Sequence, residues 1–128
     1  MTDDSLVAGR RTIVVVEDDP EIRELEVFLL GAEGYRVVGL EDGEGVLDTV
    51  HSTSADLVLL DLMLPKKSGN TVLKELSGDE HASLVPVIVV SAYTKQLART
   101  PQVQRVLAKP FDVTDLLDAV HDALSHTQ

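Results

Sequence analysis

Short runs of hydrophobic residues, rich in Val, Ile and Leu, recur along the chain between polar stretches. The runs are TIVVV (12–16), YRVVGL (35–40), DLVLL (56–60), VPVIVV (85–90) and RVLA (105–108). Three of them are apolar almost throughout, which is typical of strands that are covered on both faces. We therefore expect five short, buried strands.

The stretches between these runs carry apolar residues at helical spacing. A first helix is expected from Pro20, with Asp19 as its N-cap, and its apolar stripe would be Ile22, Leu25, Leu29 and Ala32. Further helices are expected around 46–50, after an N-cap at Ser68, and from about Asp112. The stretch 93–104 is weaker, because Pro101 interrupts it, and a short helix or an irregular loop is expected there.

Strand and helix thus alternate about five times along the chain. This alternation predicts an α/β fold, in which parallel strands are joined by right-handed crossovers and helices cover both faces of one sheet. The length of 128 residues fits a single domain.

Composition narrows the class of protein. An apolar fraction of 44% is enough for a packed core, and with only 3% aromatic residues that core must consist of aliphatic side chains. The formal charge of −11 argues against direct binding to nucleic acid or to an anionic membrane. The chain has no cysteine, no secretory signal and no apolar run long enough to span a bilayer, so we expect a cytoplasmic location.

Chemically capable residues stand at the ends of the expected strands. Ligands of open α/β sheets bind outside the carboxyl ends of the strands, and the residues at those positions are Glu17, Asp18 and Asp19, then Asp61, Ser91 and Lys109. Each of them alone is more often a helix cap, a turn residue or a solvated charge, and Asp19 is expected to be a cap. The combination of carboxylates, hydroxyl and ammonium at one sheet edge is the specific signal.

This combination predicts a metal and a nucleophile. Clustered carboxylates repel one another, and oxygen ligands with room for water suit Mg²⁺. An Asp can attack a phosphoryl group to give an aspartyl phosphate, and Mg²⁺, Lys109 and the Ser91 hydroxyl would then stabilise the phosphoryl oxygens.

Four motifs, VVVEDDP, DLVLLDLMLPKKSG, VIVVSA and LAKPF, occur in this order within residues 12–125. In these motifs the chain resembles a response-regulator receiver domain of two-component signalling, related to the chemotaxis response regulator, and the resemblance covers residues 12–125. The resemblance implies a flavodoxin-like five-stranded sheet of order 2-1-3-4-5. Residues 1–11 would be an N-terminal extension and 126–128 a C-terminal tail.

The resemblance also implies a role for each site residue. Asp61 would be the phosphoacceptor, and Ser91 and Lys109 would contact its phosphoryl group. Asp18 would bind Mg²⁺ directly and Glu17 through water, while the backbone carbonyl of Met63 would complete the protein ligands. The peptide between Lys109 and Pro110 would be cis.

Two departures from the family pattern lie between Ser91 and Lys109. Val106 stands where receivers often carry Tyr or Phe, so a switch based on a moving ring is not expected. The segment is also shorter by about one helical turn, which predicts a fourth helix that is short or irregular. Met63 and Tyr93 should flank the path of an attacking water, and we expect a comparatively long-lived aspartyl phosphate.

The leading hypothesis is a phosphorylation-dependent signalling switch rather than a metabolic enzyme. Such a switch catalyses only its own phosphotransfer and autodephosphorylation. Its partners would be a sensor histidine kinase or phosphotransfer protein and a downstream target or output domain. An Mg²⁺-dependent aspartyl phosphatase would need an acid where Met63 stands, and a module without phosphorylation would lack one of the site residues. The cognate kinase, the output and the dimer state do not follow from the sequence.

Overall fold

The computed structural model describes residues 10–95, 97–98 and 100–125 of the chain. The strands are β1 (Thr12–Val16), β2 (Arg36–Leu40), β3 (Leu57–Leu60), β4 (Val87–Ser91) and β5 (Val103–Ala108). The α-helices are α1 (Pro20–Ala32), α2 (Val46–Thr53), α3 (Gly69–Ser77) and α4 (Val113–Ser125), and a short 3₁₀ helix, η2, covers Ala82–Leu84. The expected N-terminal extension and C-terminal tail lie mostly outside the described residues.

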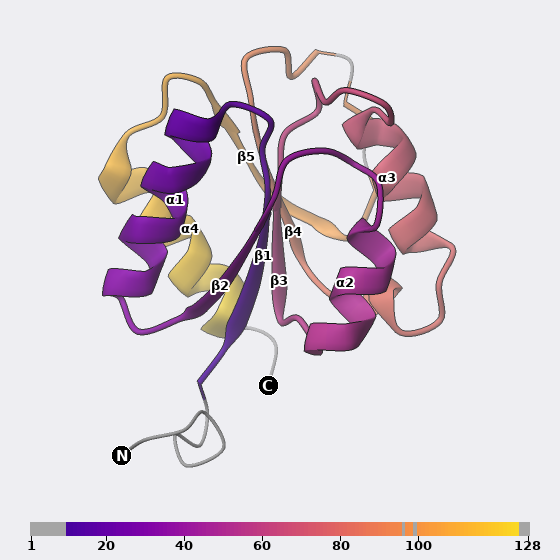
Figure 1. Ribbon diagram of the computed structural model, residues 1–128, viewed down its shortest axis with the longest axis horizontal. Coiled ribbons are helices and arrows are strands. Elements are labelled where there is room, and N and C mark those ends of the chain that lie inside the picture. The colour runs from indigo at the N-terminus through magenta and orange to yellow at the C-terminus, as the bar shows by residue number, and fades with distance from the viewer. Residues whose placement is uncertain (1–9, 96, 99, 126–128) are drawn as a thin grey trace.

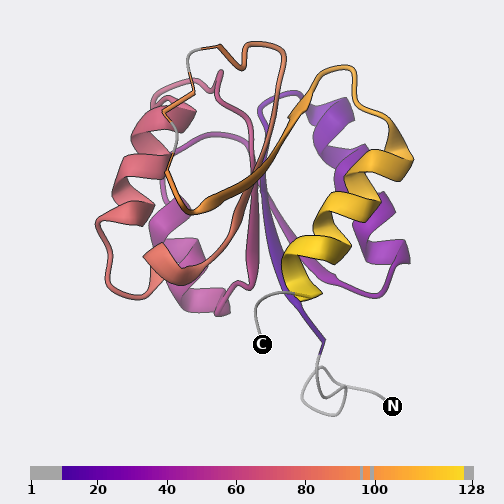
Figure 2. The same ribbon diagram turned by 180° about the vertical axis from the view of Figure 1, so that it is seen from behind.

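All five strands are parallel and form one sheet of order β2-β1-β3-β4-β5. Helices α1 and α4 cover one face, and α2 and α3 cover the other (Figures 1 and 2). The predicted fold class and strand order are therefore confirmed. Because every strand runs in the same direction, the loops that follow the strands gather at one edge of the sheet, which is the upper edge in Figure 1.

The core is divided by the sheet into two clusters. Along β1, Ile13 and Val15 pack into the cluster under α1 and α4, whereas Val14 and Val16 pack into the cluster under α2 and α3. This alternation follows from the pleat, which points successive side chains to opposite faces. It explains why the central strands are apolar throughout rather than at every second position.

Two of the described α-helices begin at the expected caps, Asp19 and Ser68, and α4 begins after Asp112, close to its expected start. Asp19 accepts hydrogen bonds from the backbone of Glu21 and Ile22, the Ser68 hydroxyl accepts one from Thr71 N, and the Asp112 carboxylate accepts from the backbone of Thr114 and Asp115. These short polar side chains satisfy backbone N–H groups that have no partner within the first turn.

The expected apolar stripe of α1 is wrong in part. Leu25 is 44% exposed, and Ala32 is also exposed. The buried residues of the helix are Leu30 and, unexpectedly, Glu26. The helix is therefore rotated relative to the predicted face, so that a carboxyl group occupies a core position.

The sequence predicted a short helix or an irregular loop between β4 and β5, and the described residues of this connection form no helix. Leu97 packs on the core beneath α2 and α3, and Ala98 N donates a hydrogen bond to Asn70 Oδ1 at 2.9 Å. Residues 96 and 99 of the expected loop lie outside the described part of the chain.

Val106 on β5 pairs with Val89 on β4 and is half-buried. An aliphatic side chain therefore occupies the position at which receivers often carry an aromatic ring.

Candidate functional site

The structure brings the chemically capable strand ends together at one edge of the sheet. Glu17 and Asp18 follow β1, Asp61 follows β3, Ser91 is the last residue of β4, and Lys109 follows β5. Parallel pairing in register places the ends of β1 and β3 side by side, because Val16 pairs with Leu60. Residues up to 92 positions apart in the sequence are thus within hydrogen-bonding distance.

Lys109 links the two buried carboxylates of the site. Its Nζ lies 2.6 Å from Glu17 Oε1 and 2.7 Å from Asp61 Oδ2. Glu17 is 1% exposed and Asp61 5% exposed. Buried charges need charge-assisted hydrogen bonds to offset the loss of hydration, and the ammonium provides one to each carboxylate.

Asp18 completes a group of three carboxylates. One oxygen each from Glu17, Asp18 and Asp61 can be chosen so that all three lie within 4.8 Å of one another. Asp18 faces solvent whereas the other two are buried, so the group is open on one side. An oxygen-only, partly open donor set of this kind fits Mg²⁺, which keeps several waters when it binds to proteins.

Burial and charge act in opposite directions on the site's titration. Burial raises the pKa of the Glu17 carboxyl above its ordinary value, and the hydrogen bonds from Lys109 and from Asp19 N oppose this only in part. For Lys109, burial acts to lower the pKa, but the hydrogen bonds to Asp61 and Glu17 outweigh it and the pKa ends above its ordinary value. The ammonium is therefore strongly retained.

The loop after β1 is held by helix α1. Arg23 Nη1 donates a hydrogen bond to the backbone oxygen of Glu17 at 2.8 Å and a longer one to that of Asp18 at 3.4 Å. The Asp19 backbone N–H donates to Glu17 Oε2 at 3.1 Å. Sequence reasoning missed Arg23, because an Arg on a helix surface gives no sign that it reaches back to a strand end.

The loop after Asp61 is fixed by two close backbone contacts. Met63 N donates to Asp61 Oδ1 at 3.1 Å, and Gly69 N donates to Leu62 O at 2.8 Å. A Cβ at Gly69 would lie 2.5 Å from both Asp61 O and Leu62 Cα. Only glycine allows the start of α3 to approach the Asp61 backbone this closely. Nothing in the sequence around Gly69 indicates this close approach.

Ser91 is fully buried at the end of β4, and its hydroxyl accepts a hydrogen bond from Tyr93 N at 3.3 Å. Met63 and Tyr93 are 52% and 62% exposed. Both line a depression of about 270 Å³ over the acidic group, together with Ile22 and Lys109. The two side chains thus stand at the mouth of the site, as expected from their spacing.

The Lys109–Pro110 peptide is cis, which the resemblance had implied.

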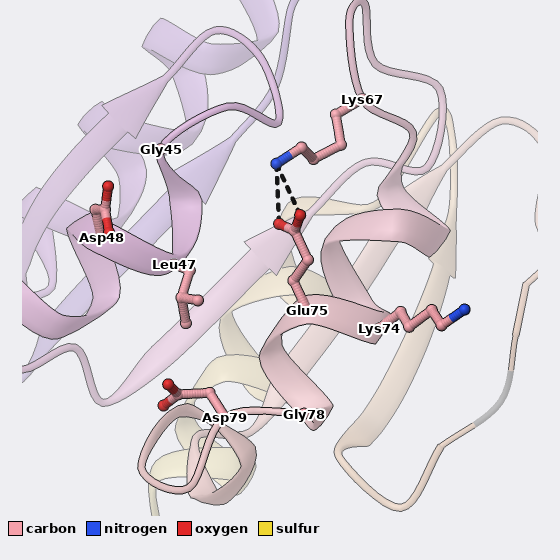
Figure 3. Close-up of a pocket in the computed structure, with 8 residues that line it drawn as sticks. All are labelled: Gly45, Leu47, Asp48, Lys67, Lys74, Glu75, Gly78 and Asp79. Atoms are coloured by element: carbon pink, nitrogen blue, oxygen red, sulfur yellow. Dashed lines mark hydrogen bonds and ion pairs between the residues drawn. The ribbon is translucent and has the colours of Figure 1, made fainter.

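The two lysines after Asp61 have partners outside the site. Lys67 Nζ lies 3.0 and 2.9 Å from the two carboxylate oxygens of Glu75 on α3, across a depression between α2 and α3 (Figure 3). Lys66 lies 3.5 Å from Asp42. Both ion pairs join the loop after β3 to neighbouring elements, and neither reaches Asp61.

Among the described histidines, His51 Nε2 lies 3.0 Å from Asp79 Oδ2. This pair is not part of the acidic group.

Residues 13–121 match the family model of the response regulator receiver domain. The chain therefore belongs to the receiver domains of two-component response regulators, the class in which phosphorylation acts as a signalling switch. It is 29% identical over 129 residues to the transcriptional regulatory protein PdtaR of Mycobacterium tuberculosis, covering 97% of this chain and 62% of that protein. The chain thus spans less than two thirds of this relative.

Solved structures agree with this assignment. A sensor protein from Polaromonas sp. JS666 superposes with a TM-score of 0.85 at 26% identity, over 93% of this chain and 99% of that one. Response regulator protein TrrA from Thermotoga maritima, solved in complex with Mg²⁺ and BeF, has a TM-score of 0.79 at 31% identity, over 89% and 99%. Among the described residues of this chain, no helix is both long and apolar enough to cross a membrane.

Proposed function

We propose that this receiver domain accepts a phosphoryl group on Asp61 and that Asp61 phosphorylation controls its partner binding. One observation carries the proposal. The Asp61 carboxylate lies at the carboxyl end of a central strand, with Oδ1 oriented by Met63 N, Oδ2 bonded to Lys109 and two further carboxylates beside it. The Asp61 carboxylate is thus held in place beside the Lys109 ammonium, and it lines a depression that a phosphoryl donor can enter.

Mg²⁺ is the cofactor that the donor set favours. Glu17, Asp18 and Asp61 would hold it, with the Met63 backbone carbonyl as a further ligand, and the complex of TrrA with Mg²⁺ and BeF supports this choice. When bound, the cation supplies positive charge beside the oxygens of the transferring phosphoryl group. The acidic residues thereby have a role beyond solubility.

The chain's own residues carry out the transfer. An Asp61 oxygen attacks phosphorus, the new P–O bond forms, and the bond from phosphorus to the donor's histidine nitrogen breaks with its electron pair remaining on nitrogen. Lys109 is held beside Asp61 and stabilises the negative charge of the phosphoryl oxygens. The Ser91 hydroxyl would turn from Tyr93 N toward the phosphoryl group.

Partner binding would change on the side of the β4–β5 connection. Ser91 begins this connection, and Ala98 ties it to α3 through Asn70. A shift of Ser91 toward the phosphoryl group would therefore move the start of this connection, which would then serve as the two-state element. Water would later hydrolyse the aspartyl phosphate and return the domain to its resting state.

The proposed setting is that of a cytoplasmic signalling protein. A sensor histidine kinase or a phosphotransfer protein would donate the phosphoryl group, and a downstream protein or an output domain would respond. Residues 12–125 would form the receiver domain. The relative PdtaR is a transcriptional regulatory protein, so the output of a receiver of this kind can lie in transcription even where the receiver itself does not contact DNA.

Phosphorylation of the purified chain by a small phosphodonor tests the proposal. Intact-protein mass spectrometry in the presence of Mg²⁺ should detect one added phosphoryl group on the wild type and none on Asp61→Asn. Asp118→Asn, which changes an exposed carboxylate on α4, is the matched control and should be labelled like the wild type. Equal labelling of wild type and Asp61→Asn, or no labelling of either, would overturn the assignment of Asp61.

A further inference from the structure

Helix α1 buries a carboxyl group that the proposed phosphotransfer does not use. Glu26 is 2% exposed, and within the described part of the chain no hydrogen bond or ion pair reaches its side chain. Burying an ionised carboxylate without such partners is costly, and a carboxyl group in this position instead keeps its proton. Replacing it with an apolar residue would avoid that cost, so its presence calls for a reason.

Glu26 lies on the part of α1 that is near the acidic site. It follows Ile22 by one helical turn, and Ile22 lines the depression over Asp61. Side chains of an α-helix tilt toward its N-terminus, and the N-terminus of α1 comes directly after Glu17 and Asp18. The Cα–Cβ bond of Glu26 is therefore tilted toward the end of α1 at which these carboxylates lie.

The charged groups that act on Glu26 belong to the site. Glu17 and Asp61 act on it as negative charges and Lys109 as a positive one. From β2, the residues that face α1 are Val37 and Gly39. The buried residues of α4 are all apolar: Leu116, Ala119, Val120, Ala123 and Leu124. A change of charge at the site therefore acts on Glu26.

We propose that Glu26 exchanges its proton in response to the acidic site, holding it while the site lacks a cation and releasing it to solvent when a divalent cation binds beside Glu17. This inference rests on the proposed function, because it uses the same cation site. In this step one O–H bond of Glu26 breaks, the proton goes to water, and the electron pair stays on the carboxylate.

Geometry and charge both support the exchange. Burial, followed by the charge of Glu17, raises the pKa of Glu26 to about 8, so the group is neutral at pH 7 and can ionise close to it. A divalent cation near Glu17 and Asp61 more than neutralises their repulsion of a third negative charge. By linkage, ionised Glu26 must in turn strengthen cation binding by the same factor. Glu26 would then couple cation occupancy to pH without touching the phosphoryl group.

Carbon-detected NMR of the side-chain carboxyl groups tests this coupling in the whole chain. The Glu26 signal is followed from pH 5 to 10, without a divalent cation and at saturating Mg²⁺, while the Asp18 and Asp61 signals report whether Mg²⁺ binds. We expect the pKa of Glu26 to fall on saturation. At pH 8, Mg²⁺ binding should release up to about half a proton per chain from this residue, because a group with that pKa is half protonated there.

Two variants complete the experiment. Glu26→Gln resembles the neutral carboxyl and cannot ionise, and Glu24→Gln changes an exposed residue on the same helix. From pH 6 to pH 9, the Mg²⁺ affinity of the wild type should increase by a factor about five times larger than that of Glu26→Gln. The affinity of Glu24→Gln should change with pH as that of the wild type does. A Glu26 pKa that Mg²⁺ does not move, with Asp18 and Asp61 responding, overturns this inference alone. Absence of any Mg²⁺ response at Asp18 and Asp61 overturns the proposed cation site and this inference with it.

Discussion

Lys109 Nζ lies 2.7 Å from Asp61 Oδ2, although 48 residues separate them in the sequence. The same ammonium bonds Glu17 at 2.6 Å. In the structure, therefore, one lysine offsets two buried carboxylates at the phosphoacceptor position proposed above. Removing it leaves both without their charge partner, which is the costliest kind of change at a buried ionic site.

Lys109→Met should lower the free energy of unfolding by about 3–5 kcal/mol at pH 7, because a buried charge pair loses one member. Urea unfolding followed by circular dichroism measures the loss. Adding Mg²⁺ should restore more stability to this variant than to the wild type, since the cation offsets the same carboxylates. Lys74→Met, on the exposed face of α3, is the control; if both variants lost equal stability, Lys109 would have no special role in the fold.

The stability of the chain should fall as pH rises because of Glu26. In the folded state this carboxyl keeps its proton up to a pKa of about 8, against an ordinary value of 4.5. Between these values the folded state binds more protons than the unfolded state, so the contribution is complete below pH 4.5 and lost above pH 8. The slope approaches about 1.4 kcal/mol per pH unit at most.

Glu26→Leu should flatten this pH dependence and be more stable than the wild type at pH 8 by at least about 1 kcal/mol, since an apolar residue replaces an unpaired buried charge. Urea titrations at several pH values would measure the effect. The raised pKa of Glu17 gives a dependence of the same sign, so some slope should remain. Identical pH profiles of the wild type and Glu26→Leu would contradict the prediction.

Gly69→Ala should disturb the Asp61 loop more than its size suggests. The new methyl group would lie 2.5 Å from Asp61 O and Leu62 Cα, so α3 or the loop must move, at a cost of about 1–3 kcal/mol. Thermal unfolding gives the stability, and phosphodonor labelling gives the function. Gly31→Ala, at a helix position with open space around it, should have little effect on either; a neutral Gly69→Ala would show that the close approach is unimportant.

The lifetime of the aspartyl phosphate should depend on Met63 and Tyr93. Both stand at the mouth of the depression over Asp61, and neither orients a water molecule well for attack. Replacing Tyr93 with Ser, or Met63 with Asn, should shorten the lifetime by about tenfold, which corresponds to about 1.4 kcal/mol in the barrier. Loss of the phosphoryl group over time, measured by mass spectrometry, checks this. Leu84→Ser, an exposed apolar site on η2, serves as the control, and unchanged lifetimes in all three variants would refute the prediction.

Much of the fold could be predicted because local signals and burial agree. The central strands are apolar throughout, and Asp19, Ser68 and Asp112 cap helices as short polar side chains do. The strand-end residues could be placed at one edge because parallel strands leave no other arrangement. The site geometry followed from the topology rather than from any single motif.

The details that escaped prediction depend on tertiary packing. The spacing of Leu25 with the other apolar residues of α1 favoured one face, yet the packing buries Glu26 and leaves Leu25 exposed. The reach of Arg23 to the Glu17 backbone and the closeness of Gly69 to Asp61 depend on how whole elements sit against each other. Such contacts have no period or spacing that the sequence alone could reveal.

The central sheet separates the interior into two compartments, and this has a consequence for how substitutions combine. Side chains such as Leu30 on one side and Leu73 on the other share no cluster, so their effects on stability should add when both are changed. Pairs within one compartment should deviate from additivity. Each face of the molecule could therefore accumulate changes independently, provided that the strands between them keep the edge at which Asp61 and Lys109 meet.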